Sequence, residues 1–97
     1  PPQTAETEKL LGEIFAVNPN YVEAHVLKAS LMAAQNKPEN EILAVLENAV
    51  ALEPNRVETY ISLARFFMRL NKAAQAEETI KKAIAAKEGV SADHVLV

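Results

Sequence analysis

The sequence contains no cysteine and only two glycines, Gly12 and Gly89, among its 97 residues. Without cysteine there is no disulfide, thiolate metal ligand or cysteine nucleophile, and two isolated glycines cannot form a glycine-rich phosphate-binding loop. Aromatic residues make up 5% of the chain, and tryptophan is absent. No stretch approaches the roughly 18 consecutive apolar residues of a membrane span, so we expect none in this chain.

A strong charge of either sign is also missing, because the formal net charge is −3. Proteins that bind nucleic acid usually carry a basic stripe, so we expect no nucleic-acid partner. The two histidines, His25 and His94, lack the HExxH spacing of a zinc site. We interpret His25 as a helix-interface residue and expect no catalytic residue, no metal and no cofactor.

Two segments of the sequence match each other 35 residues apart. Residues 18–23 read NPNYVE and residues 53–58 read EPNRVE, so Pro19 and Pro54 occupy the same place in each. One further step of the same length reaches Gly89. A period near 34 residues is typical of arrays in which each repeat contains two helices.

The turn residues around these segments predict the first helix of each repeat, over roughly 21–35 and 56–70. Each helix is preceded by an asparagine suited to an N-cap, with a glutamate three residues later; the pairs are Asn20 with Glu23 and Asn55 with Glu58. Each helix is followed by an asparagine suited to a left-handed C-cap, which is Asn36 or Asn71.

Apolar residues at helical spacing predict second helices over 39–53 and 73–88, with Pro38 at the first position of the earlier one. A further helix is expected over 4–17, with Thr4 as its cap, and another from Ser91. The apolar stripes are Leu10, Leu11, Ile14 and Phe15; Ile42, Leu46, Ala49 and Val50; and Ala76, Ile80, Ala83 and Ile84.

These residues resemble the tetratricopeptide repeat family. The later repeat matches its pattern of large and small residues at Tyr60, Leu63, Ala64, Phe67, Ala76, Ile80 and Ala83, and the earlier repeat at Ala29, Met32, Leu46, Ala49 and Pro54. The earlier repeat departs from the pattern where His25 and Lys28 replace bulky apolar residues. In the later repeat, Gly89 stands where a closing proline is usual.

The resemblance implies an all-α fold, a right-handed solenoid of antiparallel helix pairs. Residues 4–18 would be the second helix of a truncated repeat, and residues 89–97 the start of another. Residues 19–53 and 54–88 would be two repeats, the earlier with a degenerate first helix. The alanine-rich style is similar to that of bacterial members of the family. The chain lacks an initiator methionine, so we expect it to be part of a longer array.

Family members mostly bind a peptide or protein surface in a concave groove lined by first helices. The resemblance therefore implies a protein-interaction scaffold, not an enzyme. Arg65 and Arg69 lie four residues apart, on one helix face, and with Met68 they suit an acidic or C-terminal segment with an apolar anchor. Two solvated arginines on an exposed face are the alternative. The predicted groove residues are Glu23, Val26, Ser30, Ala33, Glu58, Ile61, Arg65, Met68 and Arg69.

A structural or self-associating role is the alternative function. The chain would then be a segment of a larger bacterial protein, such as an export or exopolysaccharide assembly factor, or an accessory domain of an enzyme. Both ends are expected to expose apolar residues that favour a homo-oligomer, namely Leu10, Leu11 and Ile14 at one end and Val95, Leu96 and Val97 at the other. Cytoplasm and periplasm both fit this composition.

Overall fold

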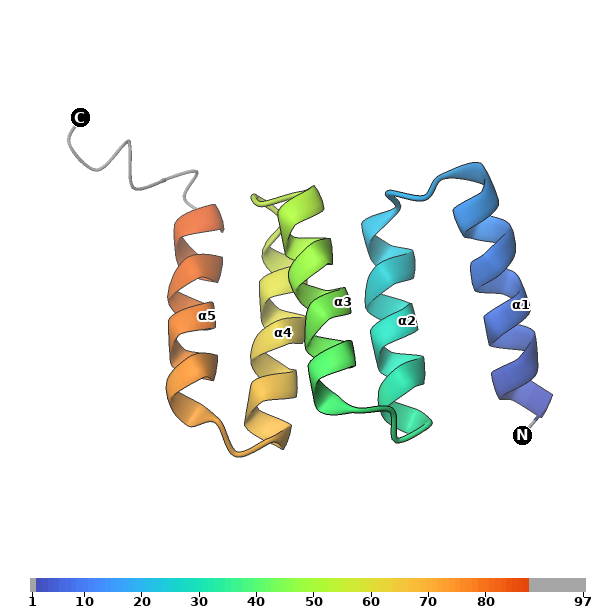
Figure 1. Ribbon diagram of the computed structural model, residues 1–97. Coiled ribbons are helices and arrows are strands. Elements are labelled where there is room, and N and C mark those ends of the chain that lie inside the picture. The colour runs from blue at the N-terminus through green and yellow to red at the C-terminus, as the bar shows by residue number, and fades with distance from the viewer. Residues whose placement is uncertain (1, 88–97) are drawn as a thin grey trace. The chain divides into compact units, whose positions relative to one another are not determined.

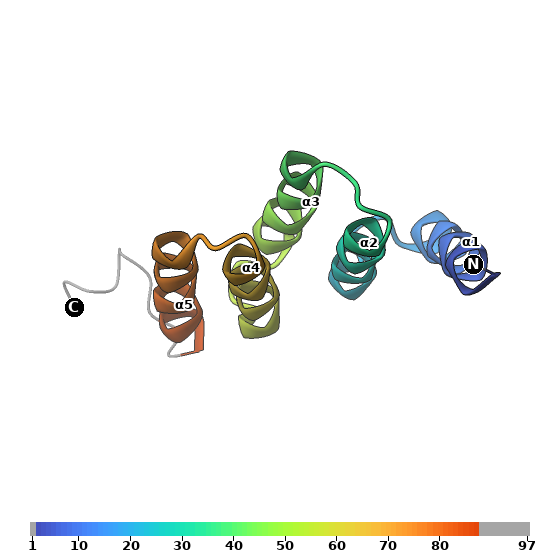
Figure 2. The same cartoon turned by 90° about the horizontal axis from the view of Figure 1, so that it is seen from below.

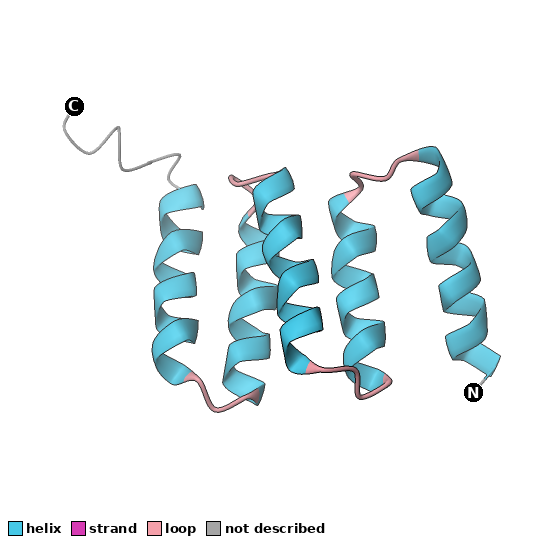
Figure 3. Ribbon diagram, in the orientation of Figure 1, coloured by secondary structure: helices cyan, strands magenta, loops and turns pink. Residues whose placement is uncertain are grey.

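The computed structural model describes residues 2–87, and within them the backbone forms five α-helices and no strand (Figures 1 and 3). The helices belong to two compact units, Pro1–Leu52 and Glu53–Val97. Their bounds lie within two residues of the predicted ones, and the helix expected from Ser91 lies outside the described residues. The first unit holds α1 (Pro2–Val17), α2 (Val22–Ala34) and α3 (Glu39–Leu52), and the second holds α4 (Val57–Arg69) and α5 (Ala73–Lys87).

In the first unit, consecutive helices run antiparallel and α2 packs against both α1 and α3 (Figures 1 and 2). Many of the buried side chains are small, which lets neighbouring helices approach closely. Val22 and Ala49 are almost completely buried, at 1% and 0% exposed. The buried apolar residues of this unit are Leu11, Val22, Ala24, Ala29, Ile42, Leu46 and Ala49.

In the second unit, α4 and α5 form one antiparallel pair (Figures 1 and 2). Four buried residues of α4 recur at the spacing of one helix face, and they are Tyr60, Leu63, Ala64 and Phe67. From α5 the small residues Ala76 and Ala83 are buried. The buried face of α4 therefore combines large and small residues, whereas the buried apolar residues of α5 are small.

Both predicted C-caps are confirmed. Asn36 and Asn71 adopt left-handed backbone conformations, with φ of 57° and 61°. After α2, the Lys37 N–H donates to the Met32 carbonyl at 3.0 Å and the Asn36 N–H to the Ala33 carbonyl at 3.1 Å. The same pair of bonds follows α4. This is the Schellman arrangement, which satisfies carbonyl groups that the helix end would otherwise leave unpaired.

The predicted asparagine N-caps are wrong. The N-cap residues are Tyr21 and Arg56, neither of which makes a side-chain capping bond. In the turn before α2 it is Asn18 that acts, because its Oδ1 accepts a hydrogen bond from the Asn20 N–H at 3.1 Å. Asn20 is therefore part of the turn and does not cap the helix, and α2 begins one residue later than the capping pattern predicts.

The predicted starts of α3 and α1 also need correction. Pro38 precedes α3, and its carbonyl accepts from the Ile42 N–H at 3.2 Å, so Pro38 is the N-cap and not the first helical residue. Thr4 lies inside α1, which begins at Pro2, and so cannot cap it. No helix within residues 2–87 is both long and apolar enough to span a membrane.

The apolar stripe of α1 is divided between two faces. Leu11 is buried at 5% exposed, so the expectation that it forms part of an exposed end face is wrong. Leu10, by contrast, is 52% exposed and Val17 is 88% exposed. The difference arises because neighbouring helix positions point about 100° apart, so that Leu10 and Leu11 cannot share the face toward α2. Ile14 is half-buried.

Candidate protein-binding site

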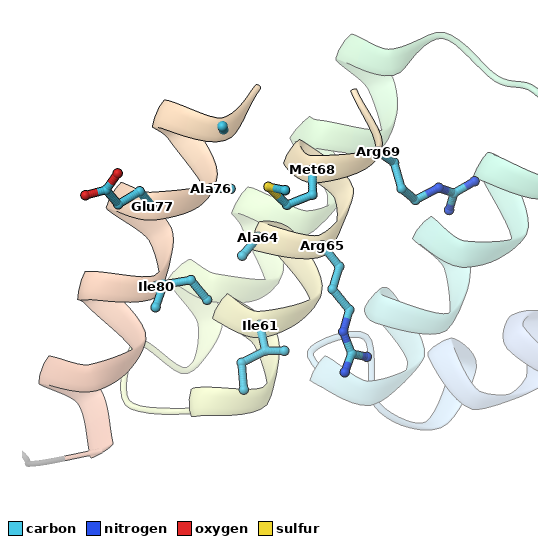
Figure 4. A pocket seen from close by; sticks show the side chains of 9 residues that line it. Ile61, Ala64, Arg65, Met68, Arg69, Ala76, Glu77 and Ile80 are labelled. Atoms are coloured by element: carbon cyan, nitrogen blue, oxygen red, sulfur yellow. The ribbon is translucent and has the colours of Figure 1, made fainter. Parts of the chain in front are cut away.

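An open hollow of about 670 Å³ lies between α4 and α5 of the second unit (Figure 4). Apolar side chains form most of its wall, and charged groups are confined to its edges. Its lining residues are Ile61, Ala64, Arg65, Met68 and Arg69 from α4, and Ala73, Ala76, Glu77 and Ile80 from α5.

The helical period of α4 places its side of the hollow. Ile61, Arg65 and Met68 recur at i, i+4 and i+7, which is one face of a helix. Ala64 lies beside this row and is 3% exposed. Ala64 and Ala76 are small and buried, so they form the floor of the hollow between the two helices. Met68, which is 57% exposed, forms part of its side.

The α5 side of the hollow was not predicted. Ala76 and Ile80 were assigned to the packed stripe of the second helix. Ala76 is indeed buried, but Ile80 is 41% exposed and Ile84 is 54% exposed. A sequence feature that could have revealed it is the width of the apolar face of α5. This face includes Ile80 and Ile84 and is wider than the part that packs against α4.

The arginines lie at the edge of the hollow and not over its centre. Figure 4 shows Met68 and Ile80 directed into the space between the helices, whereas Arg65 and Arg69 extend from α4 away from α5. Their side-chain stems contribute to the wall while the guanidinium groups stand outside it. Residues 53–87 hold no ion-pair partner for either arginine. Within this part of the second unit, neither guanidinium group is neutralised by a carboxylate.

The opposite edge of the hollow is weakly polar. Glu77 of α5 lies 3.9 Å from the Lys81 ammonium, and both side chains are more than half exposed. Exposed pairs of this kind contribute little to stability or specificity. The electrostatic character of the hollow is thus set mainly by Arg65 and Arg69.

Four of the nine predicted groove residues meet at this hollow, namely Ile61, Arg65, Met68 and Arg69. Glu58 does not line it and lies 3.8 Å from the Arg56 guanidinium, in the first turn of α4. The other four lie on α2 of the first unit, where Glu23 and Ser30 are exposed and Val26 and Ala33 half-buried. That they bind a partner stays a prediction.

His25 is a helix-interface residue, as predicted. Its ring lies 4.6 Å from that of Phe15 on α1, and its Nε2 donates to the Pro19 carbonyl at 2.8 Å. Thirty-five residues later, the Tyr60 hydroxyl donates to the Pro54 carbonyl. The two side chains therefore join each helix to the turn before it, and His25 takes the structural place of an aromatic residue.

Two further hollows lie in the first unit. One of about 450 Å³ has an apolar floor that includes Leu11, Phe15 and Met32, and its rim is joined by a 2.6 Å hydrogen bond from Gln35 Nε2 to Glu8 Oε1. Lys28, one of the departures from the family pattern, also lines it. The other, of about 430 Å³, lies at the end of α1 and is lined by Glu13, Ile14, Val17, Asn18 and Tyr21.

Comparison with known proteins identifies the repeat. A family model described as tetratricopeptide repeat matches residues 40–92, which is more than half of the chain. No curated protein matches the chain.

Among solved structures, MamA from AMB-1 is similar to this chain, with a TM-score of 0.67 and 20% sequence identity. The similarity covers 98% of this chain and 53% of MamA, so the chain spans about half the length of that protein. At this identity the likeness shows the fold alone, which confirms the all-α solenoid class. The right-handed sense of the solenoid stays a prediction.

Proposed function

Since this chain belongs to the tetratricopeptide repeat family, we propose that it is a protein-interaction scaffold that holds a partner segment in the hollow between α4 and α5. Family membership supports a scaffold in general. The hollow supports the finer assignment, because it is an apolar surface open to solvent with two arginines along one edge that have no ion-pair partner within residues 53–87. The proposal assigns no catalytic residue to the chain.

The apolar wall favours a partner with one large aliphatic side chain. Transfer of a leucine or methionine side chain from water into such a site contributes about 1.5–3 kcal/mol when burial is complete. Met68 suits this role because an unbranched thioether side chain can adapt to different anchors. Ile61 and Ile80 would flank the anchor on α4 and α5.

The arginine edge favours carboxylates beside the anchor. Guanidinium groups bind carboxylates with two parallel hydrogen bonds, and arginine is enriched among residues that dominate binding energies. Arg65 and Arg69 are one helical turn apart, which places them about 6 Å apart along the axis. A segment with acidic residues next to an aliphatic residue therefore matches both features of the site.

The test uses a set of labelled peptides that share a central leucine and differ only in whether its neighbours are glutamate, glutamine or lysine. Fluorescence anisotropy gives Kd for each peptide. We expect the glutamate peptide to bind most tightly, and salt to raise its Kd because the charges are exposed. Arg65→Glu/Arg69→Glu is expected to raise that Kd about tenfold or more, which corresponds to about 1.4 kcal/mol, and to favour the lysine peptide instead.

Lys82→Glu/Lys87→Glu is the matched control, because it makes the same charge change on exposed α5 residues outside the hollow. Circular dichroism checks that both variants keep their helices. Equal losses of affinity in the two variants would show that the net charge of the chain determines peptide affinity. They would reject a specific role for Arg65 and Arg69. Peptides that bind equally well to Met68→Asp would reject the hollow itself.

A further inference from the structure

The formal charge of the chain is divided unevenly between its two units. Residues 1–52 contain seven acidic and three basic residues, a net charge of −4, whereas residues 53–97 contain six acidic and seven basic residues, a net charge of +1. The first unit of one copy and the second unit of another therefore carry net charges of opposite sign.

The acidic unit carries an exposed amphipathic stripe on α1. Glu6, Leu10, Glu13 and Val17 follow one another at spacings of four, three and four residues, so they share one helix face. All four are exposed, Leu10 at 52% and Val17 at 88%. We call this row the outer stripe of α1, and it alternates a carboxylate with an aliphatic side chain.

The outer stripe has the composition that the α4–α5 hollow would select. Leu10 and Val17 are aliphatic anchors, and each is next to a carboxylate on the same face. Glu6 and Glu13 are seven residues apart, about 10 Å along the helix, and Arg65 and Arg69 are about 6 Å apart. The glutamates are thus about 4 Å farther apart along their helix than the arginines are along theirs. Two long, exposed arginine side chains can span this difference.

We propose that the outer stripe of α1 of one copy docks into the α4–α5 hollow of a second copy. This proposal rests on the proposed function and names its partner as the chain itself. The contact joins two different surfaces, so a pair of copies still offers one free stripe and one free hollow, and the chain forms open linear oligomers. A single helix in an open hollow makes a small interface, so association is weak and concentration-dependent.

The test blocks each surface in turn in the full 97-residue chain. Leu10→Asp/Val17→Asp removes the stripe, and Met68→Asp/Ile80→Asp removes the hollow; all four positions are exposed, so both variants are expected to fold. Sedimentation velocity measures the average mass against concentration. We expect the average mass of the unmodified chain to rise with concentration and each blocked variant alone to stay monomeric.

Mixing the two blocked variants gives the decisive result. One variant keeps its hollow and the other keeps its stripe, so the mixture is expected to form a complex of one copy of each and nothing larger. Charge reversal extends the test, because Glu6→Arg/Glu13→Arg and Arg65→Glu/Arg69→Glu are each expected to stay monomeric alone and to associate when they are mixed.

A mixture that forms no complex would overturn the proposal, as would a blocked variant that still dimerises alone. Binding of the acidic peptide by an unmodified chain that is monomeric at every concentration would reject the second copy and retain the proposed function.

Discussion

Thr59 and Thr79 show how a single hydroxyl group can matter inside the second unit. Both are buried, at 1% and 5% exposed. The Thr79 hydroxyl donates to the Gln75 carbonyl at 2.8 Å, whereas the Thr59 Oγ1 has no hydrogen-bond partner among the described residues. A buried polar atom without a partner loses its hydrogen bonds to water on folding and recovers none.

We therefore expect Thr59→Val to raise the free energy of unfolding by about 1 kcal/mol, because valine has nearly the same shape and no hydroxyl. Thr79→Val is the control and is expected to bring no gain, because it removes a bond that is made. Urea unfolding followed by circular dichroism measures both. Destabilisation by Thr59→Val would mean that its hydroxyl has a partner after all.

Gly12 lies in the middle of α1 without a packing reason. A Cβ built there meets no atom within 4 Å, so close approach of another helix does not require glycine. We expect Gly12→Ala to raise the free energy of unfolding by about 1 kcal/mol through helix propensity. Ala16→Gly, at an exposed position of the same helix, is expected to lower it by about as much. A loss in both variants would show that Gly12 has a role that its surroundings do not explain.

Helices were the part of the fold that the sequence could predict best. The 35-residue period and the apolar spacing place all five helices, because both signals are local and are repeated in register. The ends after α2 and α4 were equally predictable, since Asn36 and Asn71 adopt left-handed conformations that few other residues tolerate. The starts of α2 and α4 were not, because a polar residue lies on each side of the preceding proline, and the sequence cannot say which of them the turn uses.

Asn71 allows a test of the helix ends. Asn71→Ala is expected to lower the free energy of unfolding by about 1 kcal/mol, because alanine resists a φ of 61°. Asn71→Gly is expected to retain stability, since glycine adopts this conformation readily. Thermal unfolding of the two variants measures the difference. A variant Asn71→Ala as stable as Asn71→Gly would show that the cap conformation contributes nothing.

The candidate site was predicted only in part. The α4 residues Ile61, Arg65, Met68 and Arg69 were found because the family resemblance assigns the groove to first helices, and helical spacing then puts them on one face. The exposure of Ile80 on α5 was not, because it depends on which helices cover that face, and no local pattern reports this. The direction of the arginines likewise depends on packing, since Figure 4 shows them extending away from α5.

At the scale of the whole molecule, two units with net charges of −4 and +1 carry surfaces of complementary composition. Exposed charges are screened within about 10 Å at an ionic strength of 0.1 M. Self-association through Glu6, Glu13, Arg65 and Arg69 is therefore expected to weaken as salt is added, and sedimentation velocity at several salt concentrations measures this. Association that strengthens with salt would be driven by apolar contact alone and would contradict the role of the four charges.

The most direct test of the binding surface is the NMR signal of the methionine methyl groups. The chain has two methionines, Met68 in the α4–α5 hollow and Met32 in a hollow of the first unit. The leucine peptide with glutamate neighbours is titrated into protein labelled at both methyl groups. We expect the Met68 signal to shift until it saturates while the Met32 signal stays in place. An unmoved Met68 signal, or equal shifts of both signals, would contradict the assignment of the α4–α5 hollow as the protein-binding site.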